Sequence, residues 1–92
     1  MNFAKLEEQA SVAINEIDQF VATNGGSDQI ESIKQQMLFI RDNANSGKDP
    51  AAELGDERKF TYSIIASREF ASPAELELKE YLDEVSKLLD EK

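Results

Sequence analysis

The sequence predicts an all-α fold, a small and mostly antiparallel bundle of about four helices. Apolar residues recur at intervals of three and four, which is the spacing that places them on one face of a helix. Residues typical of helix caps separate these apolar segments. The 92 residues are enough for one modest core, so we expect a single domain over residues 1–92.

The first two predicted helices have the most regular apolar spacing. Residues 3–21 form the first, and we expect it to end at Asn24-Gly25-Gly26, because glycine adopts left-handed geometry at little cost. Its core face contains Phe3, Leu6, Ala10, Ala13, Ile17 and Phe20. Ser27 or Asp28 is placed to cap the second helix. The core face of this helix contains Ile30, Ile33, Met37, Ile40 and Ala44.

The third segment begins at Asp49-Pro50, where Asp suits the N-cap and Pro the first helical position. Residues 60–65 are rich in aromatic and β-branched side chains with partial alternation, which is compatible with a strand. No other segment resembles a strand that could pair with this one. Leu54, Thr61 and Ile65 also fit helical spacing. We therefore predict a third helix here, with a strand as the alternative.

The fourth predicted helix has the clearest start. Ser72 suits its N-cap, Pro73 its first position and Glu75 the capping box. The apolar face that follows contains Leu78, Tyr81, Leu82, Val85, Leu88 and Leu89.

The formal net charge of −9 limits the classes of partner. Nucleic acids and anionic membranes are disfavoured, because both are bound through clustered Lys and Arg. A basic protein surface is favoured, because opposite charge speeds association. The acids gather toward the two ends of the chain, whereas residues 34–68 are close to neutral. Solubility alone is the competing explanation of this charge.

Several classes of activity lack the residues they need. The chain has no histidine and no cysteine, which excludes ordinary zinc sites and Cys–His or Ser–His nucleophiles. Residues 42–53 match an EF-hand loop at both ends, but Ala44 and Pro50 leave too few oxygen ligands inside it. We therefore expect no enzymatic activity, no metal and no cofactor.

The sequence favours the cytoplasm as the location of this protein. The longest uninterrupted apolar stretch is Met37–Ile40, whereas a membrane-spanning helix needs about 20 residues. The N-terminal residues lack the apolar region of a signal peptide. The absence of cysteine is typical of a reducing compartment.

Two sets of residues are candidates for contact with a protein partner. Glu77, Glu80 and Glu84, together with Glu91, fall on one face of the last helix, away from its leucines. This face is either simply solvated or a docking face for a basic partner. Phe39 and Tyr62 are either core residues or exposed aromatic anchors of an interface.

Two linked phrases in the second half of the chain resemble a known family. They are Gln35–Asp42 (QQMLFIRD) and Ile64–Phe70 (IIASREF), the latter followed by Pro73–Leu76 (PAEL). In this order and spacing they resemble the small all-helical immunity proteins that neutralise NAD(P)-glycohydrolase toxins of bacterial type VI secretion. The resemblance covers residues 31–85, and residues 1–30 match only as a generic amphipathic helix.

The resemblance implies a function in binding. It implies a cytoplasmic immunity protein that docks on a cognate toxin domain and covers its dinucleotide site. Our candidate interface residues are Phe39, Tyr62, Glu77, Glu80 and Glu84. The alternative is a non-inhibitory helical adaptor or secretion chaperone for a protein client. The sequence is compatible with a monomer and with a homodimer in which Leu38 and Leu76 form the seam.

Overall fold

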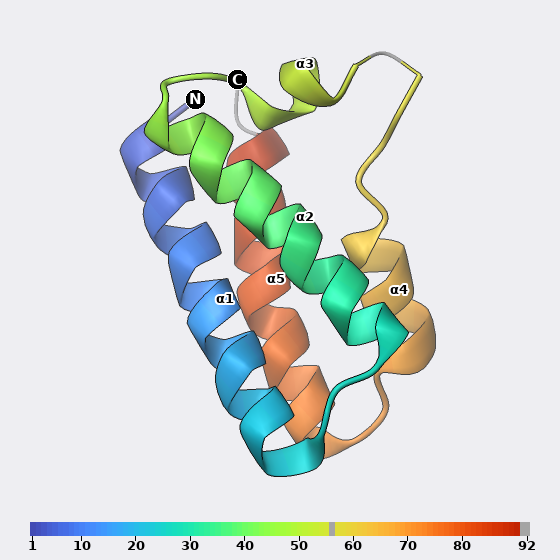
Figure 1. Ribbon diagram of the computed structural model, residues 1–92. Coiled ribbons are helices and arrows are strands. Elements are labelled where there is room, and N and C mark those ends of the chain that lie inside the picture. Colours follow the sequence, from blue (N-terminus) through green and yellow to red (C-terminus); the bar gives the residue numbers. More distant parts are fainter. Residues whose placement is uncertain (56, 91–92) are drawn as a thin grey trace.

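The computed structural model describes residues 1–55 and 57–90, and every regular element in those ranges is a helix. The helices are α1 (Phe3–Asn24), α2 (Asp28–Asn45), α3 (Pro50–Leu54), α4 (Tyr62–Glu69) and α5 (Pro73–Asp90), as Figure 1 shows. The prediction of an all-α fold is confirmed. Within the described ranges, none of the helices has the length and apolar character that crossing a membrane requires.

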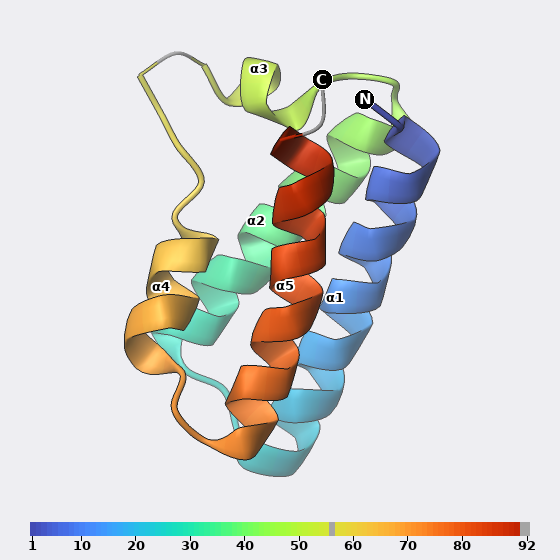
Figure 2. The same ribbon diagram turned by 180° about the vertical axis from the view of Figure 1, so that it is seen from behind.

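α2 and α5 lie between α1 on one side and α4 on the other. α1 contacts both α2 and α5, and α4 contacts the same two helices from the opposite side (Figures 1 and 2). The chain runs along α1 and α4 in one direction and along α2 and α5 in the other, so the contacting pairs are antiparallel. The short α3 contacts α2.

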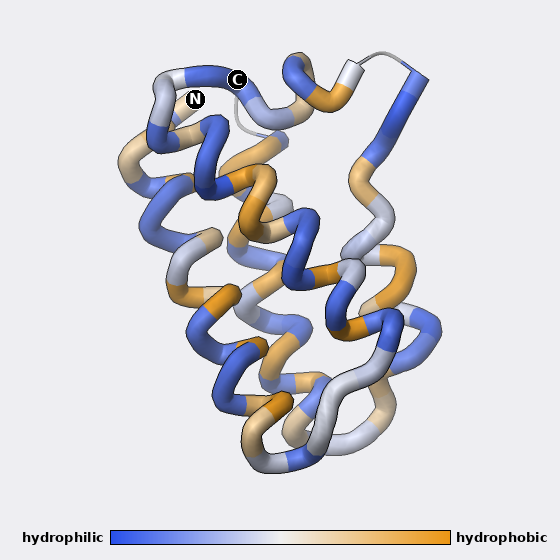
Figure 3. Tube along the Cα trace, in the orientation of Figure 1, coloured by the Kyte–Doolittle hydropathy of each residue, from blue (hydrophilic) through white to orange (hydrophobic). Residues whose placement is uncertain are grey.

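The core lies between these helices, and the apolar spacing predicted most of the residues that form it. All five residues expected from the second helix are buried, and so are Leu6, Ala10, Ala13 and Ile17 of α1. Phe3 and Phe20 are only partly buried against the core. Figure 3 shows hydrophobic and hydrophilic residues alternating along each long helix. Each fully buried Leu or Ile contributes about 1.5–3 kcal/mol to folding.

Side-chain caps fix where three of the helices begin. The Ser27 hydroxyl accepts a hydrogen bond from the Ile30 amide at 3.2 Å, so Ser27 rather than Asp28 caps α2. Asp49 accepts from the Ala51 amide at 3.0 Å, next to Pro50. α1 is capped by Asn2, whose side-chain oxygen accepts a hydrogen bond from the Lys5 amide at 3.1 Å. α1 ends at Asn24, and Gly25 follows with a φ of 86°.

The capping box predicted for α5 is present. The Glu75 amide donates to the Ser72 hydroxyl at 3.2 Å, and the Ser72 amide donates to the Glu75 carboxylate at 3.1 Å. The Ser72 backbone and side-chain hydrogen bonds, with a further one from the Ala71 amide, lower the pKa of the Glu75 carboxyl. The first turn of α5 therefore starts where the sequence indicated.

The third segment is helical at both ends but is not one helix. α3 ends at Leu54, and Gly55 follows with a φ of 98°, a conformation that side chains with a Cβ disfavour. Residues 57–61 have no regular structure, and α4 begins at Tyr62. The alternative of a strand over residues 60–65 is therefore wrong, and the prediction of helix holds only from Tyr62 onward.

The side chain of Gln36 in α2 forms hydrogen bonds with the start of α4. The Gln36 side-chain oxygen accepts hydrogen bonds from the Thr61 and Tyr62 amides, each at 2.9 Å. Its side-chain nitrogen donates to the Thr61 hydroxyl at 2.9 Å and to the Ser32 hydroxyl at 3.3 Å. Because Thr61 makes no side-chain cap of its own, Gln36 of α2 supplies the acceptor that the first turn of α4 needs.

Candidate functional site

The three glutamates predicted to share a face are exposed together on α5. This helix buries Leu78, Leu82, Val85 and Leu88 on one side. Glu77, Glu80 and Glu84 lie outside that buried stripe, and all three are exposed. We refer to these three residues as the acidic α5 face. Glu91, which we expected to extend it, lies outside the described residues.

Basic residues neutralise the acidic α5 face only in part. The Lys87 amine lies 3.0 Å from the Glu84 carboxylate, and that hydrogen bond raises the pKa of the Lys87 amine. Lys79 pairs with Asp83 at 3.0 Å and so leaves the three glutamates untouched. Within residues 1–55 and 57–90, Glu77 and Glu80 form no salt bridge. The face therefore remains negative and accessible.

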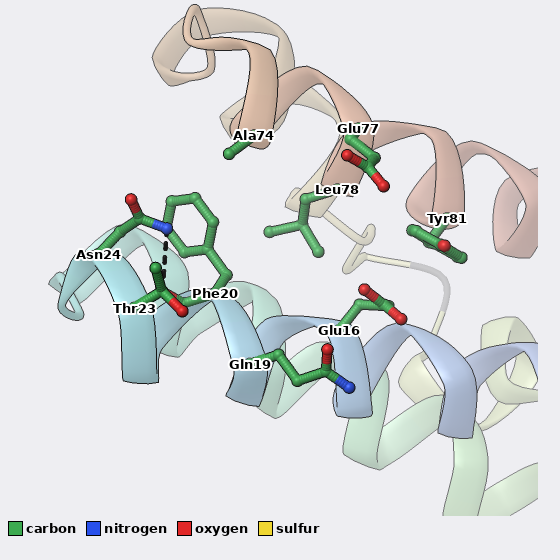
Figure 4. Close-up of a pocket in the computed structure, with 9 residues that line it drawn as sticks. All are labelled: Glu16, Gln19, Phe20, Thr23, Asn24, Ala74, Glu77, Leu78 and Tyr81. Carbon is green, nitrogen blue, oxygen red and sulfur yellow. Dashed lines mark hydrogen bonds between the residues drawn. The ribbon is translucent and has the colours of Figure 1, made fainter.

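A groove between α1 and α5 borders the acidic α5 face. Its volume is about 290 Å³. Glu77 and Tyr81 contribute from α5, and Glu16 and Phe20 contribute from α1, as Figure 4 shows. The residues lining this α1–α5 groove are Glu16, Gln19, Phe20, Thr23, Asn24, Ala74, Glu77, Leu78 and Tyr81. Helix packing thus extends the negative surface from α5 onto α1.

Tyr62 is not the exposed aromatic that an interface anchor requires. Its side chain is 2% exposed, and its hydroxyl lies 2.7 Å from the Ser86 hydroxyl of α5. Burial raises the pKa of the Tyr62 phenol. Of the two alternatives for Tyr62, a core residue is the one that the structure shows, because the ring joins α4 to the core. Tyr62 therefore adds no exposed ring to the candidate surface.

Phe39 lies on a different part of the molecule from the glutamates. It is half-buried, and its ring centroid lies 6.0 Å from that of Phe60. The two rings help to line a second groove, of about 420 Å³, which we call the α2 groove. Its lining residues are Ser32, Gln35, Gln36, Phe39, Leu54, Arg58, Lys59, Phe60 and Thr61. No residue lines both this groove and the α1–α5 groove.

The structure therefore brings together three of the five predicted interface residues and separates the other two. It adds Glu16, Phe20 and Tyr81, which the sequence analysis did not single out as binding residues. Tyr81 and Phe20 were read as core because they fit the apolar spacing. Glu16 could be assigned to this surface only once α1 was known to pack against α5.

Two further observations bear on the kind of function. In the part of the chain that the structure describes, no three acidic side chains come close enough together to hold a metal ion. Comparisons with models of protein families, with curated proteins and with solved structures give no match for this chain. Its function is therefore inferred from its own residues and their geometry.

Proposed function

We propose that this protein is a cytoplasmic immunity protein that binds a cognate secreted antibacterial toxin domain of the NAD(P)-degrading kind and blocks its active site. The immunity role and the kind of toxin come from the resemblance of the phrases Gln35–Asp42 and Ile64–Phe70 to those of immunity proteins. The observation that supports binding to a partner is the acidic α5 face, exposed on a helical scaffold and only partly neutralised.

Charge supplies a mechanism of inhibition. A site that binds the pyrophosphate of a dinucleotide presents positively charged groups to it. Carboxylates can form ion pairs with the same positive groups. Glu77, Glu80 and Glu84 would face this basic surface and close it to substrate. The long-range attraction also speeds the encounter, which suits an inhibitor that must act before the toxin does.

The scaffold suits such an inhibitor because its binding face is part of a continuous helix. We infer that α1, α2, α4 and α5 act as one four-helix bundle that holds α5 rigid. A preorganised face loses little conformational entropy on binding and therefore binds more tightly. On this proposal the protein needs no metal and no cofactor, and one copy occludes one toxin domain.

The first experiment is purification of the tagged protein from its source cells, with mass spectrometry of co-purifying proteins. We expect one stoichiometric partner that carries a toxin domain. The partner should hydrolyse NAD⁺ when isolated and be inactive in the complex. A partner that keeps full activity in the complex would instead identify a non-inhibitory adaptor or secretion chaperone, and recovery of many clients would do the same.

A charge-reversal series then tests the acidic α5 face. The triple variant Glu77→Lys, Glu80→Lys and Glu84→Lys should bind the purified partner at least about tenfold more weakly and lose its salt dependence. The matched control Glu8→Lys, Glu57→Lys and Glu69→Lys alters the net charge equally at exposed positions elsewhere. Equal affinities of the two triple variants would show that the acidic α5 face does not contact the partner.

A further inference from the structure

The α1–α5 groove sets two carboxylates opposite one another. Figure 4 shows Glu16 of α1 and Glu77 of α5 on opposite walls of it. Neither forms a salt bridge with any residue in the described ranges, and no basic residue is among those that line the groove. Carboxylates on both walls make the groove negative, and a cation placed between them is attracted to both.

Some acids on the same two helices have a basic partner. Asp18 of α1 pairs with Lys34 at 2.7 Å, and Asp83 of α5 pairs with Lys79 at 3.0 Å. Glu16 and Glu77 have none within the described residues, as is also true of Glu80. What sets the groove acids apart is that they line one groove together with aromatic rings.

Aromatic rings complete the lining. Phe20 and Tyr81 are both half-buried and packed against the core, which fixes their positions. The buried Leu78 also lines the groove. An aromatic face attracts a cation that lies within about 6 Å of the ring centroid. At about 290 Å³ the groove lies just below the roughly 300–1,000 Å³ of small-molecule sites, a size that fits a single long side chain.

We propose that the α1–α5 groove binds an arginine side chain presented by the protein partner. A planar guanidinium donates hydrogen bonds to more than one carboxylate while its faces stack on aromatic rings. Lysine carries a compact charge that cannot do both. The inference rests on the proposed function, because the occupant belongs to the partner that docks on the acidic α5 face. Glu77 belongs to both surfaces, so an arginine seated here would fix the register of the complex.

The first test uses N-acetyl-arginine-N-methylamide as the probe, added to the isotope-labelled protein and followed by NMR. We expect saturable shifts at Glu16, Phe20, Glu77 and Tyr81, in the millimolar range that suits one side chain. N-acetyl-norleucine-N-methylamide, which has no charge, should give no saturable shift there. The lysine analogue should bind at least about threefold more weakly than the arginine probe. Equal shifts with all three probes, or none with arginine, would overturn the proposal.

Substitutions test whether the arginine probe binds in the α1–α5 groove. Glu16→Gln with Glu77→Gln should weaken arginine binding about tenfold, because both acceptors lose their charge. The control Glu8→Gln with Glu69→Gln changes the net charge equally at exposed positions outside the groove and should have no effect. Tyr81→Phe keeps the ring and should bind as the native chain does, whereas Tyr81→Leu should weaken binding. Circular dichroism checks that each variant is folded.

The same variants, measured against the purified partner, separate this inference from the proposed function. If Glu16→Gln with Glu77→Gln leaves partner binding unchanged while Glu80→Lys with Glu84→Lys abolishes it, the partner docks on α5 without using the groove. That result would overturn the arginine site and keep the immunity function. If the groove variant weakens partner binding and the partner stays active in the complex, the arginine site stands and the inhibitory function falls.

Discussion

The two sides of this molecule are held in place in different ways. On one side, α1 and α5 are long helices that pack along continuous apolar faces. On the other side, residues 57–61 have no regular structure, and α4 has only eight residues. That second side depends on a few specific contacts, chiefly the side-chain amide of Gln36 and the ring of Tyr62.

This difference predicts two kinds of response to substitution. Loss of a core contact between α1, α2 and α5 should weaken the whole fold, because those helices share one apolar core. Loss of a contact that holds α4 should open that side alone, since few buried side chains tie it down.

The largest effect is expected in the shared core. Ile17 and Leu82 are both essentially inaccessible to solvent. Ile17→Ala or Leu82→Ala should lower the free energy of unfolding by about 2–5 kcal/mol, through lost burial and the cavity left behind. Urea denaturation followed by circular dichroism measures it. Leu76, at 49% exposed, is the control, and Leu76→Ala should change stability by less than about 0.5 kcal/mol.

A smaller and more local effect is expected from Gln36→Ala. The substitution removes the acceptor of the Thr61 and Tyr62 amides, at a cost of about 1–3 kcal/mol. Hydrogen exchange should speed up in the first turn of α4 while the amides of α1 keep their protection. The control is Gln35→Ala, because within the described residues the one hydrogen bond of the Gln35 side chain goes to the exposed Glu31 carboxylate. Equal acceleration throughout α1 and α4 would mean that the two sides are not separate.

These two sides also differ in how well the sequence predicted them. The long helices α1, α2 and α5 were predicted because apolar spacing and caps act within a few residues of each other. The break after Leu54 was missed, because Leu54, Thr61 and Ile65 fit one helical spacing. Gln36, whose side chain bonds to the first turn of α4, is 25 residues away from Thr61 in the sequence. For the same reason the shared exposure of Glu77, Glu80 and Glu84 was predictable, whereas the placement of Glu16 opposite Glu77 was not.

The sequence did not reveal the fate of Tyr62 either. Its aromatic ring suits a core and an interface equally well, and only the packing of α4 on α5 decides between them. Phe39 shows the same ambiguity, because it is half-buried in the α2 groove. Periodicity predicts which face of a helix is apolar but not which other element will cover it.

Tyr62→Phe should have a modest effect at neutral pH and a clear one in alkali. Losing the hydrogen bond to Ser86 should cost about 0.5–1.5 kcal/mol. Burial raises the pKa of the Tyr62 phenol, so the unfolded chain releases its proton at a lower pH than the folded chain does. Stability from this group is therefore intact below about pH 10 and falls as pH rises further.

The measurement is the free energy of unfolding between neutral pH and the alkaline limit, for the native chain and for Tyr62→Phe. The native chain should lose stability more steeply above about pH 10 than the variant does. If the two curves remain parallel, the Tyr62 phenol is not shielded from water, and α4 is less firmly seated on α5 than the 2% exposure indicates.

The smallest effect is expected at the capping box of α5, and its sign is opposite to that of Tyr62. Hydrogen bonds from Ser72 lower the pKa of the Glu75 carboxyl, so the folded chain keeps this carboxylate ionised at a pH where the unfolded chain protonates it. The stabilisation from the Glu75 carboxylate is present above its ordinary pKa near 4.5 and is lost as pH falls through the lower pKa of the folded chain.

Glu75→Gln should flatten the dependence of the unfolding free energy on pH in this acidic range only. The matched control is Glu69→Gln, which removes one carboxyl at an exposed position at the end of α4.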